Sequence, residues 1–307
     1  MDYLEPITKE KLKIIYDEFG ATEESLKNDV NILMEWLEKQ PHLPNVKDTE
    51  WLTHFLLCCK NSLERAKQKL DAYFTTKALN PSIFTKRKEM LAIAPSFSNL
   101  MCFLALPKLT KDGKRVIVLK IFQGSTFNVT SELLVNFAQL AYDILMKVDS
   151  ASQYIMIFDM ENTTVQIMAV CFPVMKKLVD QITKVNPLRI QNFYAVNVSS
   201  AVEPLINFSI SLLSKKLASR TVVWKKKAKD LAEVIDEEVL PAIYGGTEKP
   251  FEDLRDQFLE STKSIGDWLE SAEADIADLS KKPTDNGVSI DIGDYGVEGT
   301  FRKINLD

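Results

Sequence analysis

The stretch from Tyr154 to Gly246 constrains the fold most, because short apolar runs alternate in it with segments of helix length. The runs 154–159 and 192–197 are apolar except for Asp159, Asn192 and Asn197 at their ends, which is typical of strands buried on both faces. An unusually apolar helix, residues 204–217, follows them. Strands that alternate with helices predict an α/β fold with a mainly parallel sheet covered by helices. Because no segment between them supplies an obvious catalytic group, we expect this region to enclose a molecule and not to react with it.

The remaining sequence divides into parts of different character. Residues 1–90 show apolar residues at helical spacing and no strand signal, which predicts a small all-helical bundle. Residues 91–250 then form the α/β domain. The last part, 251–307, combines an amphipathic helix with a glycine-rich tail that we expect to be loosely structured. The helix is predicted to run unbroken to position 279 and to pack on the parent domain, with coiled-coil pairing as the alternative.

Further elements of the α/β domain follow from local patterns. Residues 82–103 have an irregular pattern, and Asp112-Gly113 then signals a turn before a β-branched strand. The expected elements are strands 115–122 and 221–224, and helices 131–147, 174–183 and 228–240, the last of which Pro241 ends.

The composition narrows the functional class. A formal net charge of -5 argues against binding to nucleic acid, since phosphate contacts need a basic surface. The four cysteines have neither disulfide nor zinc spacing, so we expect no metal and no cofactor. No apolar signal region stands at the N-terminus, and no run is long enough to span a bilayer. We therefore expect a reduced, cytoplasmic and monomeric protein that is peripheral on membranes.

Catalytic motifs are absent from the sequence. It has no glycine-rich phosphate loop, no Gly-x-Ser-x-Gly and no His-Glu-x-x-His. The two histidines, His42 and His54, lie in the helical region, so a catalytic site in the α/β domain would need one to reach across domains. Asp159 and Glu161 end a strand, where α/β enzymes often keep acids, but a capping or anchoring role for the turn is favoured. We expect no enzyme.

The apolar helix 204–217 and the cations beside it each allow two interpretations. Its apolar side chains cover an arc of roughly 200°, about twice that of an ordinary surface helix. The helix is therefore either buried core or faces an apolar object on more than one side. Lys216 and Arg220 stand four residues apart at its end, either as a solvated helix end or as a patch that binds phosphate beside an apolar lid.

Several motifs in a fixed order resemble those of the CRAL-TRIO family, in particular its tocopherol-transfer-like and retinaldehyde-binding-like members. The order is Ile157-Phe-Asp-Met-Glu161, then Asn186-Pro-Leu-Arg-Ile190 leading to Tyr194-Ala-Val-Asn197, and finally Leu240-Pro-x-x-Tyr-Gly-Gly246. The resemblance covers about residues 20–250 and includes the helices that precede the α/β domain. Two departures stand out. The family's Phe-Leu-Arg-x-Arg motif is here Phe55-Leu-Leu-Cys-Cys-Lys60, without either arginine, and the glycine after Phe-Asp-x-Glu is Asn162.

The resemblance implies a lipid-binding domain with helix 204–217 as a mobile gate. The expected function is to hold a small hydrophobic lipid (tocopherol, retinoid, carotenoid or a similar isoprenoid) in a closed cavity and exchange it at membranes. Transfer of phosphatidylinositol, or a lipid-sensing interaction through the C-terminal helix, is the alternative. Arg189, Lys216 and Arg220 fall at the family's phosphoinositide-binding positions. Expected wall residues, which ordinary core packing would explain equally well, are Phe158, Met160, Val165, Ile167, Met168, Phe172, Met175, Val179, Ile182, Phe193 and Ala195, with Leu205, Phe208 and Leu212 from the gate.

Overall fold

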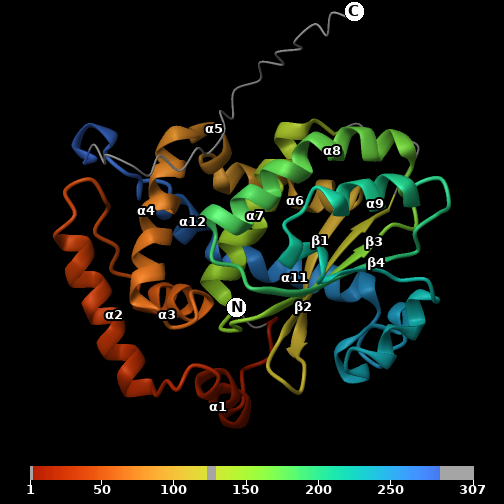
Figure 1. Cartoon of the computed structure of the whole chain (residues 1–307), viewed down its shortest axis with the longest axis horizontal. Coiled ribbons are helices and arrows are strands. Elements are labelled where there is room, and N and C mark those ends of the chain that lie inside the picture. Colours follow the sequence, from red (N-terminus) through yellow and green to blue (C-terminus); the bar gives the residue numbers. More distant parts are fainter. Residues whose placement is uncertain (1–2, 123–128, 284–307) are drawn as a thin grey trace, which may run out of the picture.

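The computed structural model describes residues 3–122 and 129–283, and Figure 1 shows their arrangement. In this part of the chain, a five-stranded sheet has the order β1-β2-β3-β4-β5. The first pair is antiparallel and the other three pairs are parallel, which confirms the predicted α/β fold behind a helical N-terminal region. The strands are β1 (Met101–Leu109), β2 (Arg115–Ile121), β3 (Tyr154–Asp159), β4 (Ile190–Val196) and β5 (Thr221–Val223).

Helices surround this sheet and form the N-terminal region. The α-helices are α1 (Lys9–Asp17), α2 (Glu23–Glu38), α3 (Thr49–Cys58), α4 (Leu63–Leu79), α5 (Pro81–Phe84), α6 (Arg87–Ser98), α7 (Ser131–Val148), α8 (Val165–Asp180), α9 (Glu203–Ser211), α10 (Lys215–Ala218), α11 (Phe251–Thr262) and α12 (Gly266–Ala272). A π-helical turn, η1 (Gln181–Val185), extends α8. Short 3-10 turns are η2 (Ala228–Glu233), η3 (Glu237–Val239), η4 (Ala242–Tyr244), η5 (Lys263–Ile265) and η6 (Leu279–Lys281).

Strand register sorts the side chains of the sheet into two faces. Successive side chains of a strand point to opposite faces, so residues paired across strands form rows on one face. On the face below α7, α8 and α9, one row runs through Phe103, Leu119, Phe158 and Ala195. The opposite face packs on the segment that carries η2 to η4, where Leu231, Leu240 and Tyr244 are buried. Both faces are covered, which explains the continuously apolar strands.

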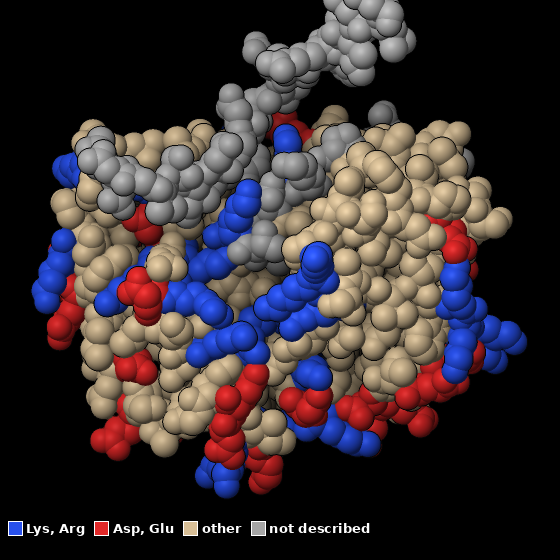
Figure 2. Space-filling model, in the orientation of Figure 1, with Lys and Arg blue, Asp and Glu red and all other residues tan. Residues whose placement is uncertain are grey.

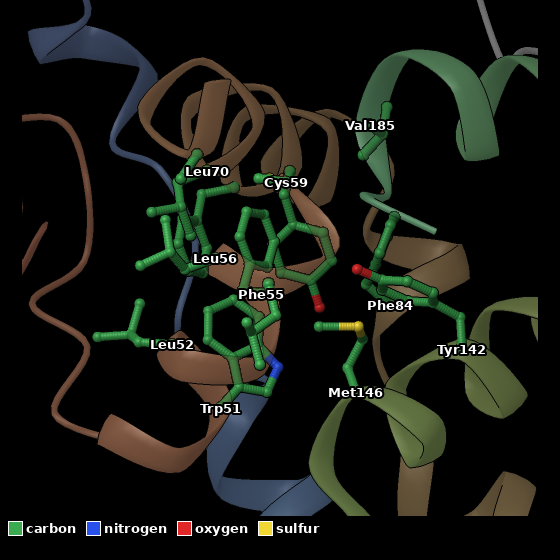
Figure 3. Packing of buried hydrophobic residues seen from close by; sticks show 14 of the residues in the cluster. Trp51, Leu52, Phe55, Leu56, Cys59, Leu70, Phe84, Tyr142, Met146 and Val185 are labelled. Atoms are coloured by element: carbon green, nitrogen blue, oxygen red, sulfur yellow. The ribbon is translucent and has the colours of Figure 1, made fainter. Parts of the chain in front are cut away.

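The N-terminal helices share one core with the α/β region. Figure 3 shows Trp51, Phe55 and Cys59 of the helical region facing Tyr142 and Met146 of α7. His54 strengthens this junction, since its ring nitrogens contact the carbonyl oxygens of Met146 and Ala151 at 3.1 and 2.9 Å. The expected boundaries near residues 90 and 250 stay predictions.

Three elements were missed because their local signals are weak. β1 begins at the end of the stretch with the irregular pattern and contains Pro107. Because β1 is an edge strand, one side of it needs no ladder hydrogen bonds, and a proline is tolerated there. Pro95 lies inside α6, and α1 precedes the first helix that we predicted. The helix expected at 174–183 begins nine residues earlier, where the side chain of Thr164 accepts a hydrogen bond from the backbone of Ile167.

Three predicted helices are interrupted in the structure. The segment 228–240 forms the 3-10 turns η2 and η3, because Val234 leaves helical geometry at φ -130°. The segment 204–217 divides into α9 and α10, and Ser214 caps the second piece. The helix expected from 251 to 279 breaks at Ile265 into α11 and α12. Its apolar side is nevertheless buried as far as Leu269, which agrees with packing on the parent domain, whereas Ile276 and Leu279 are exposed. Apart from Pro283, the predicted tail lies outside the described residues.

Candidate functional site

A cavity of about 320 Å³ lies between one face of the sheet and the helices around it. The sheet contributes the row through Phe158 and Ala195 together with the neighbouring row through Met156 and Phe193. Further wall residues come from α6, α7, α8, α9 and α11, and nearly all of them are apolar. Binding sites for small molecules are mostly apolar cavities of roughly 300–1,000 Å³ with few polar groups. This cavity therefore has the size and lining of a site for a compact hydrophobic molecule.

The structure places most of the expected wall residues at this cavity. The residues that line it are Phe158, Met160, Ile167, Met168, Met175, Val179, Phe193 and Ala195. Val165 and Phe172 do not line it. Val165 is exposed at the start of α8, and the ring of Phe172 stacks on the ring of Phe208 with centroids 5.5 Å apart. The side chain of Ile182 lies outside the described residues.

The segment 204–217 turns a different face to the cavity from the one expected. Leu205, Phe208 and Leu212 do not line it, and the exposed fractions of Phe208 and Leu212 are 54% and 62%. We chose the wrong phase of the helix because apolar residues cover so much of its circumference. The residues that face the cavity recur three or four apart, as one helix face requires, and are Ile206, Ser209, Ile210, Leu213 and Leu217.

The outer surface of this region is also apolar. Figure 2 shows a broad uncharged area where Figure 1 places α8 and α9. Phe208, Leu212 and Val165 are its exposed large apolar side chains. Exposed apolar surface of this kind marks sites that interact with proteins, ligands or membranes. The helix α9 thus has apolar side chains on both its cavity side and its outer side, as one of our two interpretations required.

Sequence reasoning missed the polar part of the wall and several helical contributors to it. Gln139 of α7, Gln181 and Asn186 all line the cavity and are buried. A signal was present, because Gln139 and Asp143 stand four residues apart, on one face of a helix that is mostly apolar. Contributions from α6 and α11 had no signal, since which helix covers a sheet depends on the tertiary fold. They include Leu91, Phe97 and Phe258.

A basic cluster forms on the surface between the N-terminal helices and α10, where Figure 2 shows Lys and Arg side chains gathered in the middle of this face. The pKa of Lys60 is lowered, first by partial burial and then by the positive charges of Arg189, Lys216 and Arg65. Two of the expected phosphoinositide residues, Arg189 and Lys216, therefore lie close enough to Lys60 to act on it electrostatically. We call Lys60, Arg65, Arg189 and Lys216 the basic cluster.

Two features limit the cations that are available for a ligand. Arg189 already pairs with Glu18, with 2.6 Å between its Nη2 and Oε1 of Glu18, and it stacks over the ring of Phe19. Partial burial alone would raise the pKa of Glu18, but the hydrogen bonds and charge of Arg189 outweigh it and lower that pKa. Arg220 donates from Nη1 to the carbonyl oxygen of Ile190 at 2.5 Å and so helps to fix β4.

The acids at the end of β3 have structural partners. Asp159 accepts hydrogen bonds from Lys120 Nζ at 2.6 Å and from the hydroxyl of Tyr244 at 2.8 Å through Oδ2. Its Oδ1 accepts from the side chain of Asn197 at 2.8 Å and from the backbone of Glu161. This arrangement is the anchoring role that we favoured for Asp159.

The cysteine thiols that line the cavity are poor nucleophiles. Burial raises the pKa of Cys171 to about 11 and that of Cys102 to about 12, so both are neutral thiols near pH 7. Within the described residues, no group of three or more His, Cys, Asp or Glu side chains could hold a metal ion.

Comparison with known proteins decides the family. Residues 101–246 match the model of the CRAL/TRIO domain. The α/β region of this chain is a CRAL/TRIO domain. This match confirms the resemblance to the CRAL-TRIO family as a whole and supports lipid binding or transfer in general. Proteins with this domain are generally not enzymes.

The remaining comparisons concern the N-terminal helices and the chain as a whole. Residues 22–92 match a second model, described as a Pinta-like UBA domain. Among solved structures, the chain is similar to the crystal structure of Sfh5, with 12% identity over 85% of this chain and 99% of that chain, at a TM-score of 0.48. Among curated proteins, no sequence matches. In the described ranges, no helix combines the length and the apolarity needed to cross a membrane.

Proposed function

We propose that this CRAL/TRIO protein carries one small hydrophobic lipid in its cavity and transfers it between membranes. The observation that supports this most is the apolar cavity beneath α9, with apolar side chains on both sides of that helix. Burial gains about 0.8 kcal/mol for each methylene group, so a long chain gains roughly 10 kcal/mol or more. Escape into water would then be very slow, and release requires an apolar acceptor.

The size of the cavity favours a single-chain ligand. Its volume of about 320 Å³ lies at the small end of the range for ligand sites. A tocopherol, retinoid, carotenoid or similar isoprenoid presents one apolar chain, whereas a phospholipid presents two acyl chains and a charged head group. Met156, Met160, Met168 and Met175 are flexible wall residues that let the cavity adapt to the shape of its ligand.

Two features of the segment 204–217 support its opening as a gate at a membrane. The break between α9 and α10, at residues 212–214, gives the helix a place to bend. Phe208 and Leu212 on the outside would enter the acyl region of a bilayer, while Ile206 and Ile210 uncover the cavity behind them. A lipid could then pass between cavity and bilayer without crossing water.

The basic cluster would orient the gate on an anionic membrane. Lys216 lies in α10, just after the break at residues 212–214, so cations and apolar outer residues lie on adjoining segments. Each Lys or Arg near an anionic surface contributes about 1 kcal/mol of attraction. Lys60 joins Arg189 and Lys216 and takes over in part from the missing family arginines. This arrangement supports the proposed binding of phosphoinositide head groups, with Arg220 in a structural position beside them.

The rival class, an interaction protein that works through its C-terminal helix, has less support. Phe251, Leu254 and Phe258 of α11 are buried against the core, so the apolar side of that helix is already occupied.

Extraction of the purified protein tests the proposed cargo. We expect organic solvent to release one isoprenoid-type lipid, identified by mass spectrometry, and the emptied protein to take up retinol or tocopherol with about one molecule bound per chain. A clean extract together with no uptake of retinoid, tocopherol, carotenoid or phospholipid would contradict the proposed function. Uptake of phospholipid alone would favour the phospholipid-transfer alternative.

The basic cluster is tested by its binding to vesicles. We expect Lys60→Ala and Lys216→Ala each to weaken sedimentation with phosphoinositide-containing vesicles about fivefold at moderate salt, and the double variant to weaken it further. Lys263→Ala is the matched control, because this exposed lysine lies directly after α11, in η5, and pairs with Glu260. Equal binding by all variants would remove the role of the cluster.

A variant that is expected to bind vesicles more strongly makes the test of the basic cluster more specific. Glu18→Gln removes the carboxylate that occupies Arg189, so it should strengthen vesicle binding where the lysine variants weaken it. Weaker binding by Glu18→Gln would show that the ion pair positions Arg189 and does not compete for it.

A further inference from the structure

The polar part of the cavity wall contains an unsatisfied hydrogen-bond acceptor. Asn186 lines the cavity, and only 3% of its surface is exposed. Among the described residues, its side-chain oxygen Oδ1 has no hydrogen-bond partner. Leaving a buried polar atom without a partner is costly, so such an atom in a native fold calls for an explanation.

The orientation of this amide is fixed by a chain of contacts that begins at a charged pair. Arg87 of α6 forms an ion pair with Asp143 of α7, with 3.2 Å between Nη2 and Oδ2. The hydroxyl of Tyr73 also donates to this carboxylate, at 3.1 Å. A carboxylate can only accept hydrogen bonds, so the neighbouring Gln139 must present its NH₂ group to Oδ1 of Asp143, and it does so at 2.9 Å.

The orientation of the Gln139 amide in turn determines the orientation of the Asn186 amide at the cavity. With its NH₂ group committed to Asp143, Gln139 presents its oxygen Oε1 toward Gln181 and Asn186. The side-chain nitrogens of both residues donate to this oxygen, at a long 3.4 Å each. If the amide of Asn186 were turned over, two oxygens would face each other. The nitrogen of Asn186 must therefore point to Gln139, which leaves its oxygen as a free acceptor.

The backbone of Asn186 is held as well. Its N–H donates to the carbonyl oxygen of Gln181 at 2.7 Å in the π-helical turn, and its own carbonyl oxygen accepts from Lys69 of α4 at 3.3 Å. The hydroxyls of Ser209 and Thr262 differ, because they already donate to carbonyl oxygens within their own helices. The hydroxyl of Tyr142 also lacks a partner among the described residues, but it can donate as well as accept, whereas Oδ1 of Asn186 can only accept. The acceptor at Asn186 is thus both fixed in place and unused.

From this relay we infer that the cavity selects lipids with a free hydroxyl group, which donates its proton to Oδ1 of Asn186. The inference rests on the proposed lipid-carrying function and narrows its ligand to an alcohol or phenol. An ether, ester or aldehyde with the same chain has no donor and would leave the acceptor unsatisfied. A pure hydrocarbon would do the same.

Matched ligands test the inference without any mutation. We expect retinol to bind the lipid-free protein about tenfold more tightly than retinyl methyl ether or retinal, measured by fluorescence titration. Equal affinities would overturn the inference and leave lipid carriage intact. Failure of all three ligands, and of their tocopherol counterparts, would instead count against the proposed function.

Variants of the wall residues identify the group that accepts the hydrogen bond from the hydroxyl of the lipid. Asn186→Leu should remove the preference by weakening retinol binding about tenfold while the methyl ether binds as before. Ser209→Ala and Thr262→Val are the controls and should keep the preference. If Asn186→Leu does not fold, Gln139→Leu serves instead, because it releases the amide of Asn186 to turn and should reduce the preference. A preference that survives at position 186 or disappears with Ser209→Ala would contradict the assignment.

Discussion

Ala195→Trp is expected to abolish lipid uptake. Ala195 lies near the end of β4 and lines the cavity, next to Phe158 on the neighbouring strand. An indole ring at this position would occupy much of a cavity of about 320 Å³. We expect the affinity for retinol to fall more than tenfold, because the ligand and the ring compete for the same volume. Equilibrium binding of a fluorescent retinoid measures the effect.

A matched variant separates loss of the cavity from damage to the sheet. Val222→Trp places the same ring on the adjacent strand, where Val222 pairs with Tyr194 on the opposite face and is partly exposed. It should bind lipid as the unaltered protein does. Overpacking costs typically 1–3 kcal/mol, so Ala195→Trp should still fold cooperatively in thermal unfolding. A folded Ala195→Trp variant with normal uptake would show that lipid binds elsewhere.

The cavity residues of β3, β4 and α8 were predictable from sequence, whereas those of β1, β2, α6, α7, α9 and α11 were not. The side chains of the apolar strands β3 and β4, which carry Phe158 and Phe193, alternate between the two faces of the sheet. Because parallel pairing keeps these strands in register, the residues that they turn toward the cavity follow directly. In the segment 204–217, the apolar pattern does not indicate which residues face the cavity. Ile206 and Phe208 are both apolar, and only the tertiary fold decides that the first faces the cavity and the second faces outward.

Polar and basic features depended on contacts between distant residues. Asp143 and Asn186 are far apart in sequence, and each alone reads as an ordinary polar residue. Their connection through Gln139 appears only when α7 and η1 meet. Lys60 similarly lies near Arg189 and Lys216, a relation that the comparison of motifs did not reveal. The motif order fixed the family because it spans the sheet, but it could not specify these side-chain relations.

The buried pair of Arg115 and Asp149 is expected to dominate stability. Arg115 is 1% exposed and contacts both carboxylate oxygens of Asp149, at 2.8 and 3.1 Å. It also donates to the carbonyl oxygens of Leu106 and Pro107, so it joins β1, β2 and the end of α7. Arg115→Met should lower the free energy of unfolding by about 3–5 kcal/mol at pH 7, because it leaves a buried carboxylate without its partner. Urea unfolding measures this loss.

The pH dependence identifies the cause of that loss. Burial alone would raise the pKa of Asp149, but the charge and hydrogen bonds of Arg115 outweigh it and lower the pKa. In the unaltered protein, the carboxylate therefore contributes stability above its unfolded pKa of about 3.9, and this is lost as pH falls through the folded pKa. In Arg115→Met, burial is the dominant influence on Asp149, so the pKa of Asp149 in the folded state lies above its value in the unfolded state. The loss in free energy of unfolding, relative to the unaltered protein, should therefore shrink as pH falls from 7 to 5. Lys47→Met, which breaks the exposed pair with Glu38, should change stability little at either pH. A deficit that is constant with pH would mean that Arg115 acts through packing and its carbonyl contacts, and not through the charge of Asp149.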